Sequence, residues 1–374
     1  MKKQTAQWAW LVLVAGCGAG SLPYPVPPKD AGVDAVSDLG VRDATATDRG
    51  PLDVSRFDVG DAGLPADLGV SDAGSDVVEA GSMLEGPACE MALALASSRM
   101  VIEGLTAARD FVFDGHGGVA VAQGATVVLR RAGDSSPITM VMSGEVVALR
   151  FTRNSGLVLA VLNETDSGTS SGAIYRVAPG ATTAELRHAG LRRPGGLAID
   201  SADRIWFSDT TANTVYRLSA DADADAGAET MVTSVPSPTQ LLIDAEGRFL
   251  FVARSDTNTV MRVAMASSDA GSDGGTVGPA MPFVGGFSRV SGLAQDECGN
   301  VFVADEIVDR IWRVPILAGA AVLVVTDVRG PRSLMFGVGD PFGPRELYAI
   351  STTDGTLRAA NLVARGVPLA VPAR

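Results

Sequence analysis

The chain has 374 residues, of which 46% are hydrophobic, and a formal net charge of −13. This negative charge disfavours nucleic acid as a partner, because phosphate binding depends on clustered Lys and Arg. The chain has two His residues and no Lys after Lys29, which excludes a zinc site built from several histidines, a Schiff-base lysine and a P-loop lysine.

The N-terminus carries a targeting segment. Lys2 and Lys3 form a positive region, residues 9–14 form an apolar run too short to span a bilayer, and small residues precede Cys17. This pattern resembles a bacterial lipoprotein signal. The resemblance implies that residues 1–16 are removed and that Cys17 carries the lipid, which anchors the protein to a membrane without spanning it. The alternative is an ordinary signal peptide in which Cys17 is incidental.

The residue after the lipid-bearing cysteine bears on localisation. In well-studied sorting systems an Asp at this position retains a lipoprotein at the inner membrane, whereas this chain has Gly18. The resemblance therefore favours the outer membrane of the cell envelope. It leaves open whether the protein faces the periplasm or the outside.

Residues 17–82 are rich in Pro, Asp, Ala and Gly. Asp recurs here at intervals of three to six residues, from Asp30 to Asp76. This spacing lacks the nonapeptide of calcium-binding β-rolls and the Asp-x-Asp-x-Asp-Gly core of an EF-hand loop. Low hydrophobicity and self-repelling charge predict a disordered linker, which as a random coil would span on the order of 40–50 Å. Such a linker would hold the next domain clear of a membrane.

Residues 83–374 contain a repeat of short apolar runs. The runs begin 38, 48, 45, 51 and 46 residues apart, at Val119, Leu157, Ile205, Leu250, Val301 and Leu347. A period of 40–50 residues with several strands in each unit is typical of a β-propeller, and six units indicate six blades. The predicted fold is therefore all-β: a six-bladed β-propeller preceded by a disordered linker.

An arginine recurs inside three of these units. Arg217, Arg262 and Arg313 each lie 12 residues after the start of their apolar run, on a strand that follows it. Strand alternation places Tyr216, Met261 and Trp312 on the face opposite these arginines. We expect the aromatic and Met side chains to pack between blades and the arginines to reach solvent or a neighbouring loop.

The units resemble NHL-type repeats, and their layout resembles the six-bladed propellers of the senescence-marker-protein/gluconolactonase superfamily. The segment 291–305, SGLAQDECGNVFVAD, is the closest local match. The resemblance covers residues 100–365 approximately and rests on turn and strand patterns that many propellers share. It implies a fold more firmly than an activity.

In enzymes of that superfamily one divalent cation sits at the mouth of the central channel. The resemblance would make Glu103, followed by Gly104, the first-blade glutamate ligand. The places of the other Asn and Asp ligands instead read Gly195-Gly196, Thr239-Gln240 and Ser291-Gly292, and Arg109 and Arg332 stand near the remaining equivalents. A hard cation such as calcium needs several oxygen ligands, preferably carboxylates, so Glu103 is a weak metal candidate and no cofactor is assigned.

The other titratable residues have structural explanations. His116 and His188 are expected to lie in solvated turns, and Asp side chains that end strands ahead of glycine turns are expected to cap those turns. The strand-ending residues are Asp114, Asp200, Asp244 and Asp296. Residues 221–227, with their alternating Asp and Ala, and residues 267–275 are expected to form surface loops, since the first segment lacks the Glu of a calcium loop.

Two cysteines remain besides Cys17. In an oxidising compartment Cys89 and Cys298 are expected to form a disulfide, the alternative being two buried thiols. Residues 91–96 alternate as a strand would, so Cys89 would precede a strand added to close the ring. The bond would tie the end of the linker to the fifth unit.

Two functional hypotheses follow from these features. The first is a non-catalytic, lipid-anchored propeller, monomeric, that binds a protein, a glycan or a small molecule through the loops at one end of its channel. The second is a divalent-metal-dependent lactonase or ester hydrolase of the gluconolactonase type. The missing metal ligands favour the first.

Overall fold

The computed structural model describes residues 95–367, except 165–169, 220–226, 266–276, 318 and 363. The expected signal segment 1–16, the linker 17–82 and the two Asp-rich inserted loops, apart from Gly227, lie outside these residues. The described part of the chain contains 24 strands and no helix, and therefore no helix of membrane-spanning length and hydrophobicity.

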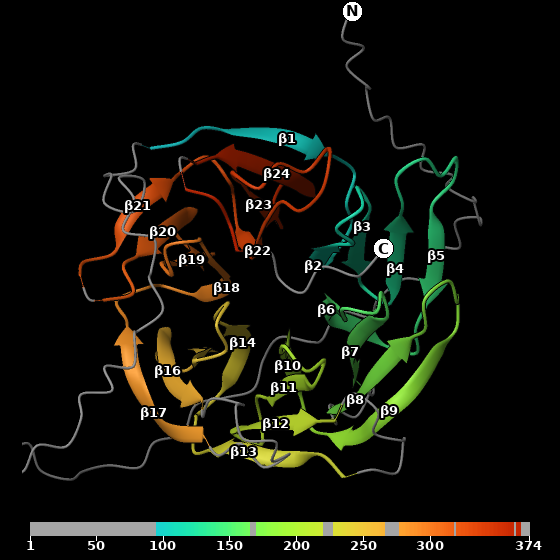
Figure 1. Ribbon diagram of the computed structural model, residues 1–374, viewed down its shortest axis with the longest axis horizontal. Helices are drawn as coiled ribbons and strands as arrows, with labels where there is room; N and C mark the ends of the chain where they lie inside the picture. The colour runs from blue at the N-terminus through green and yellow to red at the C-terminus, as the bar shows by residue number, and fades with distance from the viewer. Residues whose placement is uncertain are drawn as a thin grey trace, which may run out of the picture. The chain divides into compact units, whose positions relative to one another are not determined.

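The 24 strands form six antiparallel sheets of four strands each, arranged around a central axis (Figure 1). We number these sheets as blades 1–6 in the chain order of their innermost strands. The chain is thus a six-bladed β-propeller, as its sequence predicts.

From the channel outward, blade 1 consists of β2 (Ala108–Phe113), β3 (Val119–Gln123), β4 (Thr126–Arg130) and β5 (Ile138–Val141). Blade 2 consists of β6 (Glu145–Phe151), β7 (Leu157–Glu164), β8 (Ser170–Val177) and β9 (Ala184–Leu191). Blade 3 consists of β10 (Pro194–Ile199), β11 (Ile205–Asp209), β12 (Thr214–Leu218) and β13 (Glu229–Thr233).

Blade 4 consists of β14 (Pro238–Ile243), β15 (Phe249–Arg254), β16 (Thr259–Met265) and β17 (Val277–Val284). Blade 5 consists of β18 (Val290–Gln295), β19 (Val301–Asp305), β20 (Arg310–Val314) and β21 (Val322–Val325). Blade 6 consists of β22 (Pro331–Phe336), β23 (Glu346–Ser351), β24 (Thr356–Asn361) and, outermost, β1 (Ser98–Ile102).

The six apolar runs of the sequence are the second strands of the six blades. They are buried nearly throughout, because both faces of a blade pack against neighbouring blades; in β11 and β19 every residue is buried. One such layer, between blades 3 and 4, contains Trp206, Val215, Leu250 and Val252. The hydrophobic core is therefore a set of layers between blades.

The ring closes through β1, which comes from the N-terminal side of the propeller and completes blade 6. It pairs antiparallel with β24, and Arg99 on β1 holds the carboxylate of Glu346 on β23 through both oxygens at 2.8 Å. The closing strand begins at Ser98, later than the alternation at 91–96 predicts: residues 91–94 lie outside the described residues, and Ala96 makes only an isolated bridge to Val325.

A buried carboxylate joins blade 1 to both of its neighbours. Asp110 on β2, fully shielded from solvent, accepts hydrogen bonds from the backbone N–H of Leu149 at 2.9 Å and from Arg150 Nη1 at 2.8 Å, both on β6. Its other oxygen accepts the hydroxyl of Ser333 on β22. Blades 6, 1 and 2 therefore meet at one charged group beside the channel.

The repeated arginines were expected to reach solvent or a neighbouring loop; Arg313 reaches the β18–β19 turn, whereas Arg217 is buried against its own blade. Arg217 is 4% exposed and pairs with Glu229, and Arg313 is 7% exposed and lies 3.3 Å from Asp296 Oδ2. Arg262 stacks over the rings of Phe249 and Phe283, with its guanidinium carbon 4.8 and 5.7 Å from their centres. Each arginine therefore contacts partners within its own blade.

The expected disulfide stays a prediction. Cys298 lies in the turn between β18 and β19, where its backbone N–H donates to Asp296 Oδ1 at 3.0 Å. Cys89 lies outside the described residues.

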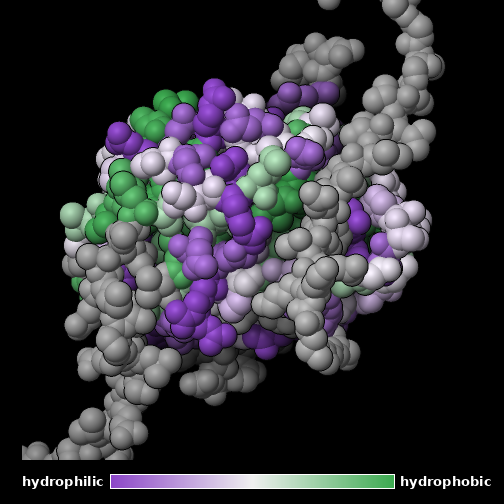
Figure 2. Space-filling view, turned by 90° about the horizontal axis from the view of Figure 1, so that it is seen from above, coloured by the Kyte–Doolittle hydropathy of each residue, from purple (hydrophilic) through white to green (hydrophobic). Residues whose placement is uncertain are grey.

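The outer surface carries hydrophobic residues at several separate places. Met100 on β1 and Val141 on β5 are exposed, as are Leu95 and Leu317. On the face seen in Figure 2, a hydrophilic band separates the hydrophobic patches.

We predict that Asp110→Ala lowers the free energy of unfolding by about 3–5 kcal/mol, because it leaves the Arg150 guanidinium buried without its partner. Chemical denaturation of the full chain measures the loss. The matched control is Glu164→Gln, which removes the exposed partner of Arg193 and should cost less than about 1 kcal/mol. Equal losses in the two variants would contradict the joining role of Asp110.

Candidate functional site

The six innermost strands begin at the same end of the channel, and we call this end the upper mouth. A cavity of about 600 Å³ opens there, and residues from all six blades line it. The lining comes from strand starts, such as Arg109 and Arg332, and from the ends of second strands, such as Leu162 and Thr210. A pocket of this size accommodates a small organic molecule.

The charged side chains of the upper mouth are mainly cationic. Four arginines and two glutamates line the cavity, which leaves a formal charge of +2 in a chain whose net charge is −13. The arginines are Arg109, Arg193, Arg289 and Arg332, and the glutamates are Glu145 and Glu306.

Each glutamate is held by arginine. Glu145 pairs with Arg109, and Glu306 lies 3.4 Å from Arg332 Nη1 and 3.9 Å from Arg289 Nε. Arg193 turns to Glu164, with which it forms an exposed pair at 3.2 Å. The two carboxylates of the cavity are thus already neutralised by cations.

The pKa of Arg332 reflects the charges that surround it in the mouth. Burial and the nearby charge of Arg109 lower the pKa of Arg332 from its ordinary value, while Glu306 and Glu145 act in the opposite direction. A guanidinium stays protonated in any case, so the site holds like charges in close proximity. An anion placed between Arg109 and Arg332 would relieve that repulsion.

Two arginines of the mouth were not singled out from the sequence, although a repeat marks them. Asp209 and Asp305 end the second strands of blades 3 and 5, and each accepts the backbone N–H of an arginine 16 residues earlier. These are Arg193, at 3.1 Å, and Arg289, at 2.8 Å. Aligning the two units on Asp209 and Asp305 would have revealed both arginines.

The glycines at the expected ligand positions have a packing role. A Cβ on Gly196 would lie 2.5 Å from the carbonyl oxygen of Thr239 in blade 4, and a Cβ on Gly292 would lie 2.5 Å from the carbonyl oxygen of Arg332 in blade 6. Neighbouring innermost strands approach so closely that no side chain fits. The Asn or Asp of a metal site therefore cannot stand here without separating the blades.

Hydroxyl groups bind these close strands together. Ser208 Oγ donates to the carbonyl oxygen of Thr239 at 2.7 Å, Thr210 Oγ1 to that of Pro238 at 2.8 Å, and Ser291 Oγ to that of Pro331 at 2.6 Å. Thr210 and Ser291 line the cavity, and because their hydroxyl protons are used between blades, their oxygens retain only acceptor capacity.

Glu103, the weak metal candidate, lies away from this site. It is exposed in the segment between β1 and β2, and it does not belong to the residues that line the upper mouth. Arg109, six residues later, occupies the start of the first innermost strand. Among the described residues, no three His, Cys, Asp or Glu side chains gather in an arrangement that could hold a metal ion.

The two histidines lie apart from the mouth lining. His116 is exposed in the β2–β3 turn, as predicted. His188 lies on β9 rather than in a turn, with its ring centre 5.5 Å from that of Phe207. Burial lowers the pKa of His188, which favours its neutral form. The turn prediction for His188 was wrong because β9 runs from Ala184 to Leu191 and includes it.

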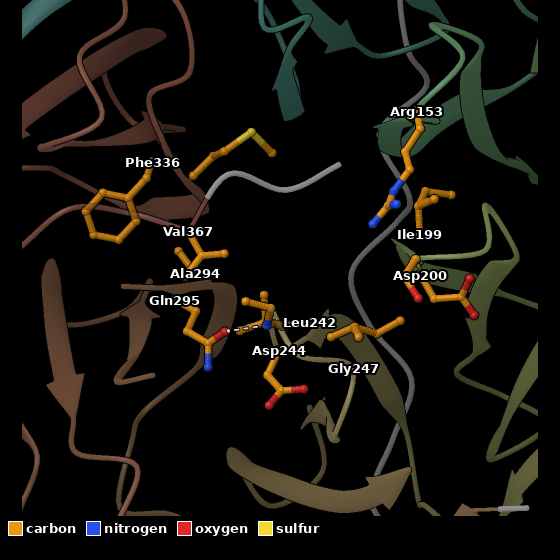
Figure 3. A pocket seen from close by; sticks show the side chains of 14 residues that line it. Arg153, Ile199, Asp200, Leu242, Asp244, Gly247, Ala294, Gln295, Phe336 and Val367 are labelled. Atoms are coloured by element: carbon orange, nitrogen blue, oxygen red, sulfur yellow. Dashed lines mark hydrogen bonds between the residues drawn. The ribbon is translucent and has the colours of Figure 1, made fainter. Parts of the chain in front are cut away.

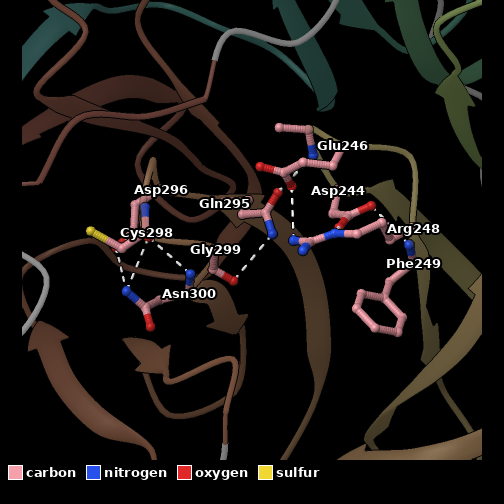
Figure 4. A network of polar contacts seen from close by, with 10 residues as sticks. Asp244, Glu246, Arg248, Phe249, Gln295, Asp296, Cys298, Gly299 and Asn300 are labelled. Carbon is pink, nitrogen blue, oxygen red and sulfur yellow. Dashed lines mark hydrogen bonds and ion pairs between the residues drawn. The ribbon is translucent and has the colours of Figure 1, made fainter. Parts of the chain in front are cut away.

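The strand-ending aspartates cap their turns as predicted. Asp114 Oδ1, Asp200 Oδ1 and Asp296 Oδ1 each accept two backbone N–H groups of the following turn, and Asp244 Oδ1 accepts that of Phe249 at 2.8 Å. Asp296 also binds the side-chain amide of Asn300 at 3.0 Å (Figure 4). Burial raises the pKa of Asp244 and of Asp296, although the hydrogen bonds and arginines around them oppose this.

The opposite end of the channel, the lower mouth, is less polar. A cavity of about 350 Å³ opens there between the ends of the innermost strands (Figure 3). Leu242, Ala294 and Phe336 supply apolar walls, and Arg153 points into the cavity from the β6–β7 turn. The carboxylates at its rim, Asp200 and Asp244, serve as the turn caps described above.

No known family's sequence pattern matches the chain, and no curated protein matches it. The fold of the chain is, however, similar to that of several solved structures. Regucalcin, a calcium-binding protein from Agrobacterium tumefaciens, superposes with a TM-score of 0.58 at 11% identity, over 75% of this chain and 98% of that one. A candidate gluconolactonase superposes with a TM-score of 0.56 at 17% identity, over 73% and 94%.

A third structure is an auxiliary nutrient binding protein from Bacteroides ovatus. It superposes with a TM-score of 0.54 at 11% identity, over 69% of each chain. The chain has the six-bladed fold of the gluconolactonase and regucalcin propellers. At these identities the similarity shows the fold alone.

Proposed function

We propose that this protein is a non-catalytic ligand-binding propeller of the bacterial cell envelope, anchored by lipid on Cys17 and displayed on the linker 17–82. Its ligand site is the upper mouth. The observation that carries the proposal is the cavity of about 600 Å³ at which each of the six blades presents a charged or a hydroxyl-bearing side chain. That the nutrient binding protein shares this fold supports a binding role.

The alternative is a divalent-metal-dependent lactonase, which the shared fold with the candidate gluconolactonase supports. The mouth disfavours it on electrostatic grounds. A dication would approach four arginines, and the two carboxylates available to it, Glu145 and Glu306, already pair with Arg109, Arg289 and Arg332. Hard cations bind several oxygen ligands, which this lining does not assemble.

An occlusion variant tests the ligand site. Ser255 is exposed and lines the upper mouth, so Ser255→Trp should fill the entrance without disturbing a blade. We expect that, in a screen of sugars, sugar phosphates, dicarboxylates and amino acids, at least one compound raises the melting temperature of the full-length protein. A ligand present at 100 times its Kd stabilises the folded protein by about 2.7 kcal/mol. This shift should vanish in Ser255→Trp.

The matched control is Ser201→Trp at the lower mouth, where Ser201 is likewise exposed. It should keep the thermal shift. The lactonase alternative is checked on the same preparation by its calcium and zinc content and by δ-gluconolactone hydrolysis with and without EDTA. One equivalent of bound metal together with EDTA-sensitive hydrolysis would overturn the proposal in favour of the alternative.

The lipid anchor has a separate test. Cys17→Ser removes the thiol that would accept the lipid, so the variant expressed in a bacterial host should lose incorporation of a fatty-acid label. Cys298→Ser, which leaves the N-terminal pattern intact, should keep the label. Equal labelling of Cys17→Ser and wild-type protein would contradict anchoring at this residue.

A further inference from the structure

We infer that the ligand of the upper mouth is a small polar anion whose carboxylate or phosphate group binds between Arg109 and Arg332. This inference rests on the proposed function of the mouth as a ligand site. It assigns the chemical class of the ligand and the two residues that recognise its charge.

The two arginines occupy equivalent positions in adjacent blades. Arg109 is the second residue of β2 and Arg332 the second residue of β22, and these innermost strands belong to neighbouring blades 1 and 6. Both side chains are about one-third exposed, at 34% and 30%, so they are partly dehydrated yet open to the cavity. Burial lowers the pKa of Arg332, and the nearby positive charge of Arg109 lowers it further.

Each arginine has donors to spare. A guanidinium carries five N–H groups in a planar fork that matches a carboxylate or phosphate. Arg109 directs Nε to Glu145, and Arg332 directs Nη1 to Glu306. The described residues provide no further hydrogen-bond acceptor for either side chain, so the remaining N–H groups can serve a ligand.

The residual positive charge of the arginine cluster also favours an anionic ligand. Arg109, Arg289 and Arg332 form ion pairs with only two carboxylates, Glu145 and Glu306, so this cluster keeps one positive charge. Those ion pairs fix the arginines in place before a ligand arrives. Pre-positioned guanidinium groups lose less conformational entropy on binding an oxyanion.

The far side of the cavity recognises a different chemical group. Thr210, Thr239 and Ser255 donate their hydroxyl protons to backbone carbonyls at 2.8, 3.2 and 3.3 Å. These three residues line the cavity, and each oxygen keeps lone pairs that can accept a hydrogen bond from an O–H or N–H donor of the ligand. The ligand thus combines one anionic group with a hydrogen-bond-donating body small enough for about 600 Å³.

Paired probes that share a sugar ring, one member carrying an anionic group at C6 and the other a hydroxymethyl group, test the inference by titration calorimetry on the full-length protein. The pairs are glucose 6-phosphate with glucose and galacturonate with galactose, and inorganic phosphate serves as the bare oxyanion. We expect the charged member of at least one pair to bind at least tenfold more tightly than the neutral one and to weaken as KCl is added. Which pair responds distinguishes a phosphate from a carboxylate ligand.

Variants assign the effect to the two residues. Arg109→Gln and Arg332→Gln should each weaken binding of the charged probe about tenfold or more and leave the neutral probe unchanged. Arg332→Lys should restore part of the affinity, and the melting temperature of each variant verifies folding. The matched control is Arg153→Gln, which removes an exposed cation from the lower mouth and should have no effect.

The outcomes separate this inference from the proposed function. If neutral sugars bind as tightly as their charged partners and Ser255→Trp abolishes that binding, the mouth is a ligand site but the anion assignment is wrong. If Arg153→Gln weakens binding as much as Arg332→Gln, the effect is general electrostatics and the assignment is also wrong. If neither these probes nor the thermal-shift panel bind in a way that Ser255→Trp abolishes, the proposed function fails as well.

Discussion

The structure depends on closing a ring. The hydrophobic core of a propeller lies between blades, so every blade needs two neighbours and an open ring would expose a full layer of buried side chains. Here β1 completes blade 6, and Arg99 forms an ion pair with Glu346. The buried carboxylate of Asp110 binds Arg150 in blade 2 and Ser333 in blade 6. Charged groups thus link blades 6, 1 and 2 at this joint.

The same closure creates the upper mouth. Arg109 and Arg332 begin the innermost strands on either side of the joint between blades 1 and 6, so closing the ring brings their charges together. Asp110 and Ser333, the next residues along β2 and β22, form the joint itself. The ligand site and the closure are thus built from adjacent positions on the same two strands.

Much of the fold could be predicted from the sequence because the repeat is strong. The six apolar runs became the second strand of every blade, and the aspartates at the turns cap them as expected. Strand alternation did not predict that Arg217 and Arg313 are buried, since it distinguishes two faces of a strand but both faces of a blade are covered; Arg313 still reaches the neighbouring β18–β19 turn, one of the two expected outcomes. The position of β1 was also missed, because a closing strand is chosen by its partner β24 and not by alternation alone.

The site was harder to predict than the fold. The sequence showed that metal-ligand positions carry glycine and arginine, but not why: Gly196 and Gly292 allow adjacent strands to touch, a contact between segments about 40 residues apart. The ion pair of Arg332 with Glu306 likewise joins different blades. Such contacts depend on the offset between strands of neighbouring blades. The residue pattern of a single sequence does not specify that offset.

The central claim is that the upper mouth is an oxyanion site and not a cation site. Anomalous diffraction from crystals of the protein grown with selenate, an oxyanion that scatters anomalously and resembles phosphate, tests it most directly. The account predicts a selenium peak within hydrogen-bonding distance of both Arg109 and Arg332. Selenate bound only elsewhere, or a divalent cation held by Glu145 and Glu306 at that place, would contradict it.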